Sequence, residues 1–465
     1  MKIKILVASI AALAAGAIFV AGQDQIAGTI TKPQGKPKIA VIDFRGAGDA
    51  QKYMAAFNTT LWDLLSNSGV LQMVGKSMYP LDIPQQPQDF KPPSTVPGAR
   101  RGDPPRVVKN GPWLTDWSGP PTNAGYLVFG YTAVQDGRLL LRGFLFNVNQ
   151  PDVGSALLIG KLYFGSLDED GAKKVASDFA ADILQQFGQK SLTGTKIYFV
   201  SDRTGNKEIW SMDYDGSNQK QMTSYRTISK EPVVSADGRM FAFTSLIKGS
   251  WQVMVHSVET GRKLPFYNPI SSTIETPEFT PDGKHILYAA SLNGYVNICI
   301  ADVNGGGMTQ LTRVKSQEVS PKVNPKTGRE VLFISGRSGI EQLWKMTIDG
   351  ADVQMVTDGQ GYVANPSWNP NGQSIAFAWT KGYDPGSYNI FVMDLASKHY
   401  DQLMSNSGKN ENPWWAPDGA HLVYQSTPAH GRSTQIYSML ADGTHPQQLT
   451  TQGNNTQPVW ANAIN

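Results

Sequence analysis

Apolar residues in the second half of the chain occur in short runs that recur with a common landmark, a proline followed two positions later by an aromatic or β-branched residue. The landmark prolines are Pro232, Pro277, Pro321, Pro366, Pro413 and Pro458. A spacing of about 45 residues, with several short apolar runs in each copy, is typical of the blades of a β-propeller.

The copy that begins at Asn410 shows the internal pattern most clearly. A strand through Asn410–Trp415 is followed by the turn Pro417–Asp418–Gly419, in which proline presets φ and glycine supplies a positive φ. The runs His421–Ser426, Gln435–Met439 and Gln448–Thr450 then predict three further strands. Four strands in each of six copies predict a six-bladed β-propeller.

The two ends of the repeated region predict how the ring closes. The first copy, Thr195–Thr223, lacks the leading strand with its proline, whereas the last, Gln457–Ala461, consists only of that strand. Together they would complete one blade, and closure would hide the edges that an open array exposes. We therefore expect residues 191–465 to form an all-β propeller closed by the C-terminal strand.

The preceding residues, 38–190, predict a small α+β domain. Ile39–Phe44 has the composition of a strand, and Asp49 is placed to cap a helix that ends near Ser66. Ser166 and Glu169 have the spacing of a capping box before a second helix. The proline-rich stretch Tyr79–Pro121 is expected to be a solvated excursion from this domain. The alternative is a basic binding site formed by Arg100, Arg101 and Arg106.

The first residues resemble an export signal. Lys2 and Lys4 precede the apolar run Ile5–Val20, and small residues follow near Gly22. We expect residues 1–22 to be a signal peptide, although a membrane anchor is the alternative. Residues 23–37 are polar and contain glycine and proline, which predicts a mobile segment that either serves as a linker or docks on a partner.

Composition adds two constraints. The formal net charge of the 465 residues is +3, and removal of Lys2 and Lys4 leaves +1 (3 − 2), which does not provide the field that nucleic acid binding needs. The single cysteine, Cys299, lies in an apolar run and is expected to be buried as a small hydrophobic residue.

Catalytic signatures do not emerge from the sequence. No nucleophile elbow or Walker loop is present, and no histidine has a second His or Cys at metal-ligand spacing. His285 and His421 occupy one place in two copies, just after the turn, which is expected to be a surface position. The six histidines are His256, His285, His399, His421, His430 and His445. We expect no enzymatic activity.

The loops that enter the first strand of each copy offer a candidate binding site. An acidic or amide residue stands near each proline, and first strands lie nearest a propeller's axis, so these side chains are expected to ring one mouth of the channel. The candidates are Glu231, Glu275, Glu318, Asn365, Glu411, Asn412 and Gln457. Their four carboxylates could attract a basic partner segment or a cation such as calcium. The alternative is hydrogen bonding to neighbouring backbone amides.

These features together resemble the TolB family of the Tol–Pal system. The resemblance rests on the order of export signal, α+β domain and six blades, on Lys38–Phe44, on Tyr79–Pro87 and on the segment Gly130–Gly137. It covers nearly all of the chain after the signal, whereas Pro92–Pro112 is an addition. The blade motif alone is less specific, because it occurs in other exported propellers.

The resemblance implies a monomeric, non-enzymatic periplasmic adaptor without cofactors, peripheral to membranes, that maintains the outer membrane and supports cell division. TolB-like proteins bind the peptidoglycan-associated lipoprotein Pal through the propeller face around the channel, which implies this role for the loops named above. They contact TolA through the mature N-terminal segment, here Gln23, Asp24, Gln25 and Ile26. The alternatives are an exported propeller that binds sugar or peptide, and an enzyme with a peptidase or lyase site in the channel.

Overall fold

The computed structural model describes residues 35–97, 104–271, 273–383, 386–405, 408–429 and 431–464. The predicted signal peptide, the candidates Gln23, Asp24, Gln25 and Ile26, and His430 lie outside these ranges. The description below concerns the compact unit Pro37–Asn465.

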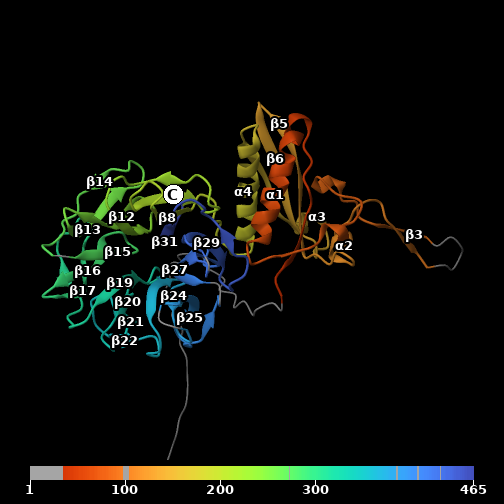
Figure 1. Cartoon of the computed structure of the whole chain (residues 1–465). Helices are drawn as coiled ribbons and strands as arrows, with labels where there is room; N and C mark the ends of the chain where they lie inside the picture. The colour runs from red at the N-terminus through yellow and green to blue at the C-terminus, as the bar shows by residue number, and fades with distance from the viewer. Residues whose placement is uncertain are drawn as a thin grey trace, which may run out of the picture. The chain divides into compact units, whose positions relative to one another are not determined.

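Residues from Lys196 onward form six four-stranded antiparallel sheets (Figure 1). Blade 1 has the order β10-β9-β8-β31, and blades 2 to 6 each contain four consecutive strands, from β11–β14 to β27–β30. The bounds are β8 Lys196–Ser201, β9 Glu208–Asp213, β10 Lys220–Gln221, β11 Ser229–Val234, β12 Met240–Ile247, β13 Ser250–Ser257, β14 Lys263–Leu264, β15 Ile274–Phe279, β16 His285–Leu292, β17 Tyr295–Asp302, β18 Thr309–Gln310, β19 Glu318–Val323, β20 Glu330–Ser335, β21 Gln342–Thr347, β22 Gln354–Met355, β23 Val363–Trp368, β24 Ser374–Trp379, β25 Asn389–Asp394, β26 Tyr400–Gln402, β27 Lys409–Trp415, β28 His421–Thr427, β29 Gln435–Leu440, β30 Gln447–Gln448 and β31 Asn455–Ala461.

Blade 1 is built from both ends of the repeated region. Strand β31 pairs antiparallel with β8, with Trp460 opposite Ile197 and Ala461 opposite Lys196. The indole N–H of Trp460 donates to Oγ1 of Thr195 at 2.9 Å, and the ring is almost fully buried. The predicted six-bladed ring closed by its last strand is therefore confirmed.

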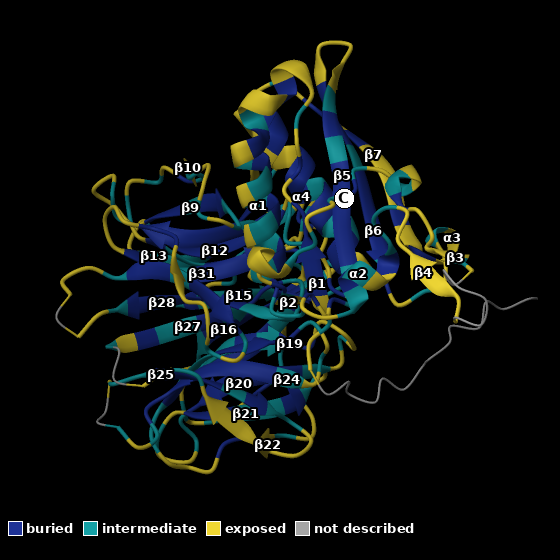
Figure 2. Ribbon diagram, turned by 90° about the vertical axis from the view of Figure 1, so that its right-hand side faces the viewer, coloured by how far each residue is buried: buried dark blue, intermediate teal, exposed yellow. Residues whose placement is uncertain are grey.

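Each pair of neighbouring blades shares an apolar layer. Leu287 and Ile298 of blade 3, for example, pack in one cluster with Val331 and Phe333 of blade 4. Figure 2 shows the inner strands of the blades as mainly buried, with exposure concentrated in the connecting turns. Cys299 is buried in β17, as expected. The interlocking layers couple each blade to the next one.

The residues before the propeller form a five-stranded sheet of order β2-β1-β5-β6-β7. Helices α1 and α4 lie side by side on one face, and α2 with its flanking loops covers part of the other face (Figure 1). The bounds are β1 Lys38–Val41, α1 Met54–Ser66, β2 Gln72–Met73, α2 Leu114–Ser118, β5 Tyr126–Gln135, β6 Arg138–Asn147, α3 Val153–Ala156, β7 Leu157–Gly165 and α4 Glu169–Gln186. The predicted α+β class is confirmed.

Both helix starts differ from the expectation. Asp49 lies within a 3₁₀ helix, Gly48–Tyr53, that precedes α1, and it pairs with Lys52 instead of capping. The cap of α4 is Asp168, whose side chain accepts from the N–H of Gly171, while Ser166 donates to Asp168. An aspartate closer to the first turn can reach the free N–H groups, which displaces the predicted Ser166 cap.

The proline-rich addition contains a two-stranded arm. Strands β3 (Ser94–Val96) and β4 (Arg106–Val108) pair antiparallel, and their residues are almost all exposed (Figure 2). The predicted solvated excursion, Tyr79–Pro121, holds for this arm but is wrong for the rest of the stretch. Phe90, Leu114 and Trp117 are buried, because their apolar side chains pack on the sheet.

Ring closure makes a stability prediction. Trp460→Ala should lower the free energy of unfolding by about 3–5 kcal/mol, because it opens a cavity in the layer that closes the ring and removes the hydrogen bond from the indole to Thr195. Chemical denaturation followed by far-ultraviolet circular dichroism measures this change. The exposed residue Tyr267, changed to Ala, is the control and should shift stability by less than about 0.5 kcal/mol. Equal midpoints for the two variants would contradict a closed blade 1.

Candidate functional site

One mouth of the propeller channel is lined by residues from all six blades. The residue immediately before each landmark proline faces this opening, and the prolines and Trp414 form the wall beneath it. The six residues are Glu231, Thr276, Ser320, Asn365, Asn412 and Gln457. They supply hydroxyl, amide and carboxylate groups around a floor of proline, valine, Trp414 and Lys322, and the hollow has a volume of only about 80 Å³.

These six residues share an unusual backbone conformation. Their φ values run from 51° to 56°, in the left-handed region that non-glycine residues seldom occupy. In each blade the pairing of the first strand with the second is irregular at this point. Thr276 is β-branched, which makes its left-handed conformation costly. The recurrence of this strain marks the mouth as a specialised part of the fold.

The strained backbone aims N–H groups at neighbouring blades. The N–H of Glu231 donates to Oε1 of Gln457 at 2.9 Å, that of Thr276 to Oε2 of Glu231 at 2.9 Å, and that of Ser320 to Oγ1 of Thr276 at 3.1 Å. The Gln457 N–H donates to Gln425 of blade 6 at 2.8 Å. Hydrogen bonds thus run from blade to blade around part of the mouth, as the alternative of backbone hydrogen bonding had anticipated.

The predicted ring of four carboxylates is wrong in its geometry. Only Glu231, Asn365, Asn412 and Gln457 among the candidates line the mouth, whereas Thr276 and Ser320 hold the places assigned to Glu275 and Glu318. Strand β19 begins at Glu318, three residues before its proline, so this side chain points into the blade. It is fully buried and bonded to Ser335 and Arg337.

The other two misplaced carboxylates have basic partners. Glu275 and Glu231 both pair with Lys230, at 2.9 and 3.1 Å, and Glu411 lies 3.1 Å from Lys409. Burial disfavours the Lys230 ammonium, but the two carboxylates outweigh it and raise the pKa of Lys230. No three acidic, His or Cys side chains in the described ranges lie close enough to hold a metal ion.

The residue that follows each landmark proline was not among the predicted site residues. It places Lys322, Glu278 and Trp414 in the channel, where Lys322 Nζ lies 2.8 Å from a Glu278 oxygen and 4.4 Å from the centre of the Trp414 ring. Burial raises the pKa of Glu278, and the Lys322 charge opposes that rise. Lys322 and Trp414 line the mouth and also the hollow at the other end of the channel. Counting one position on from each proline would have found all three.

Comparisons with known proteins assign the family. A family model described as the TolB beta propeller domain (PD40) matches residues 183–384 and 354–463. The chain belongs to the TolB β-propeller family. This confirms the resemblance that the order of domains and the blade motifs had indicated.

Individual relatives agree with that assignment. The chain is 31% identical over 213 residues to a TolB homologue from Chlorobium chlorochromatii, which is 46% of each protein, and 32% identical over 167 residues to one from Chlorobaculum tepidum, 34% of this chain and 37% of that protein. The matches thus span about half or less of these relatives. The crystal structure of TolB from Acinetobacter baumannii has the same fold, with a TM-score of 0.70 at 19% identity over 92% of this chain and 97% of that one.

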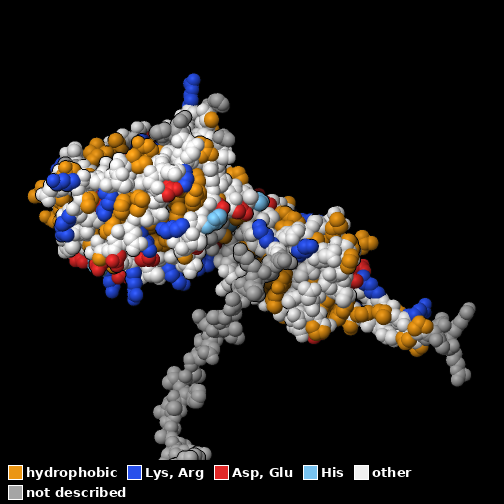
Figure 3. Space-filling view, turned by 90° about the horizontal axis from the view of Figure 1, so that it is seen from below, with side chains coloured by type: hydrophobic (Ala, Val, Ile, Leu, Met, Phe, Trp, Pro, Cys, Tyr) orange, Lys and Arg blue, Asp and Glu red, His pale blue; other side chains and the backbone are white. Residues whose placement is uncertain are grey.

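The charged side chains on the face drawn in Figure 3 are scattered among uncharged ones and do not form one continuous basic patch. None of the helices in the described ranges combines the length and the hydrophobicity that a membrane span requires. The view agrees with the near-neutral charge of the sequence.

The inter-blade hydrogen bonds make a second prediction. Glu231→Ala removes the shorter of the two hydrogen bonds of the Thr276 N–H, at 2.9 Å, and the acceptor of the Thr244 hydroxyl, at 2.8 Å. The free energy of unfolding should therefore fall by about 1–3 kcal/mol. Glu231→Gln retains a carbonyl oxygen and should cost less. Denaturation of both variants checks this order, and a larger loss for Gln than for Ala would show that Glu231 does not act as an acceptor here.

Proposed function

We propose that this protein is a non-enzymatic periplasmic adaptor of the Tol–Pal type, whose channel mouth binds a Pal-like peptidoglycan-associated lipoprotein. Membership of the TolB propeller family supports this role. The observation on which the proposal rests is the mouth itself, where all six blades contribute polar groups around a floor of prolines and Trp414.

The mouth has the features of a protein-binding surface. A polar rim around prolines and an aromatic side chain is the usual composition of a binding hot spot, and here Lys322 adds one charge beside Trp414. Proline and the inter-blade hydrogen bonds hold this surface rigid, which lowers the entropy lost on binding. The hollow of about 80 Å³ is much smaller than the roughly 300–1,000 Å³ of small-molecule pockets, which favours a protein ligand over a sugar at this end.

The second part of the proposal is contact with TolA through residues 23–26, which lie outside the described ranges. Together the two contacts would link the cell envelope layers, maintain the outer membrane and support cell division. The sequence supports export through residues 1–22, and the propeller needs no metal or cofactor for such a role.

A binding measurement tests the proposed contact. Asn365→Arg places a long charged side chain on the rim, and we expect it to weaken binding of the soluble domain of Pal from the same organism by about tenfold or more, since a buried unpaired charge is costly at an interface. Isothermal titration calorimetry measures the affinity. Lys326→Ala, an exposed turn residue between the first two strands of blade 4, should leave it unchanged.

The same titration separates the alternatives. No heat with Pal from the unmodified protein would reject the adaptor role, and heat with peptides or oligosaccharides alone would favour the generic binding propeller. Equal affinities of Asn365→Arg and the native chain for Pal would show that Pal does not bind at the mouth.

A further inference from the structure

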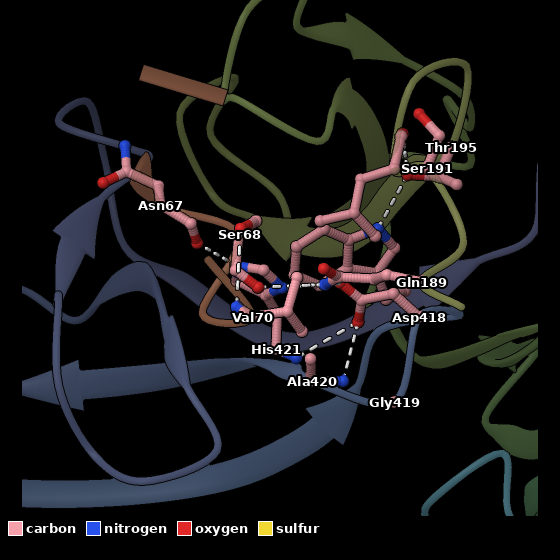
Figure 4. A network of polar contacts seen from close by, with 12 residues as sticks. Asn67, Ser68, Val70, Gln189, Ser191, Thr195, Asp418, Gly419, Ala420 and His421 are labelled. Atoms are coloured by element: carbon pink, nitrogen blue, oxygen red, sulfur yellow. Dashed lines mark hydrogen bonds and ion pairs between the residues drawn. The ribbon is translucent and has the colours of Figure 1, made fainter. Parts of the chain in front are cut away.

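A second specialised site lies where the propeller contacts the α+β domain, within the unit Pro37–Asn465. Here the turn between β27 and β28 meets the end of α1 and the linker after α4 (Figure 4). His421 Nδ1 lies 2.6 Å from Oδ2 of Asp418, and His421 Nε2 lies 3.0 Å from the carbonyl oxygen of Asn67. The sequence had predicted a surface position for His421, but its side chain is only 15% exposed because the α+β domain covers it.

The linker joins the same network. Nε2 of Gln189 donates to the Ser68 carbonyl at 3.0 Å and to Oδ2 of Asp418 at 3.1 Å (Figure 4). The Asp418 side chain is fully buried, and its Oδ1 accepts from the N–H groups of Ala420 and His421. One carboxylate therefore organises the propeller turn, the linker and the histidine together.

The geometry determines the protonation state of His421. Both ring nitrogens face oxygen acceptors, and a neutral imidazole has only one N–H to donate. The imidazolium satisfies both contacts and also supplies the counter-charge that a buried carboxylate requires. Burial disfavours the charged ring, but Asp418 and the Asn67 carbonyl outweigh it and raise the pKa of His421. Burial also disfavours the Asp418 carboxylate, but His421 and the backbone N–H groups of the turn outweigh it and lower the pKa of Asp418.

The elements packed around His421 contribute further titratable groups. A pocket of about 280 Å³ beside it is lined by Asp63 of α1, Lys190 of the linker, and Tyr214 and Asp215 of the turn after β9. Two of these groups are acidic and Lys190 is basic, whereas the partners that shift the pKa of His421 are Asp418 and the Asn67 carbonyl. The pocket also gives water and protons access to the interface.

Corresponding positions in other blades show that this arrangement is particular to blade 6. In blades 2 and 3 the turn aspartates, Asp237 and Asp282, accept from Ser235 and Thr280 at 2.6 and 2.5 Å. Blade 6 has Ala416 at that place and lacks this hydroxyl, and Oδ2 of Asp418 contacts His421 and Gln189 instead. His285, the counterpart of His421 in blade 3, is 42% exposed and 3.7 Å from Asp302.

We propose that protonated His421 is a pH-sensitive latch between the α+β domain and the propeller, which loosens when His421 loses its proton as the pH rises. The sign follows from the direction of the shift. A histidine whose pKa is raised in the folded protein contributes its stabilisation in full below the ordinary value near 6.5, and that contribution is lost as the pH rises through the raised value.

Two measurements on the full mature chain test the latch. Proton–carbon NMR of the histidine rings should show that His421 titrates above the ordinary value near 6.5, whereas titration below it would overturn the proposal. Single-molecule energy transfer reports domain coupling, with dyes on Lys174→Cys in α4 and Lys284→Cys in blade 3. Cys299 does not compete for dye, because burial raises its pKa to about 12.

The expected result is a population of separated domains that grows roughly tenfold or more between pH 6 and pH 9, the effect of losing a hydrogen bond to a charged group. His421→Gln should show that separated population already at pH 6 and lose the pH response. His285→Gln is the matched control and should keep the native pH response. In the same way, Asp418→Asn should abolish the pH response, whereas its counterpart in blade 3, Asp282→Asn, should leave it unchanged.

A native chain without a pH response, or a response abolished equally by His285→Gln, would overturn the proposal. If the His421 variant does not fold, as judged by circular dichroism, the ring titration and the native pH response still decide. Both readouts are independent of Pal binding, so they separate failure of the latch from failure of the proposed function.

Discussion

The pairing of β31 with β8 is the contact on which the rest of the structure depends. It joins segments at opposite ends of the repeated region, with Trp460 opposite Ile197, and it completes the sixth sheet of the ring. Without it, blade 1 would lack its innermost strand and Gln457 would leave the mouth. The inter-blade hydrogen bond from Glu231 to Gln457 would then have no acceptor. Closure thus creates both the fold and the surface that the proposed function uses.

The mouth and the latch show how one repeated motif acquires different roles. The residue before each landmark proline has a left-handed conformation in all six blades, at the point where the pairing of the first two strands shifts register, and these residues form the rim. At the other end of the first strand, the turn aspartate accepts a hydrogen bond from a hydroxyl within its own turn in blades 2 and 3. In blade 6 alanine replaces that hydroxyl residue, and the turn contacts the α+β domain. A repeat therefore specifies the scaffold, and single departures from it mark the sites.

The sequence predicted the architecture well because blade periodicity and turn chemistry are local signals. The prediction for Glu275, Glu318 and Glu411 was wrong because it considered only that an acidic residue lies near each proline. Successive side chains of a strand point to opposite faces, so a shift of one position moves a side chain away from the mouth. Thr276 and Ser320 share the mouth with Glu231 only through the irregular pairing before each proline. The covering of His421 could not be read from the sequence, because it depends on contact with Asn67, 354 positions away.

The central claim is that the channel mouth is the surface that binds a partner protein. Hydrogen–deuterium exchange of the mature chain, with and without the soluble domain of Pal, tests it most directly. The account predicts slower exchange in the loops that lead into β11, β15, β19, β23, β27 and β31, with the outer strands unchanged. Protection confined to the α+β domain or to the outer strands, with these loops unaffected in a saturated complex, would contradict it.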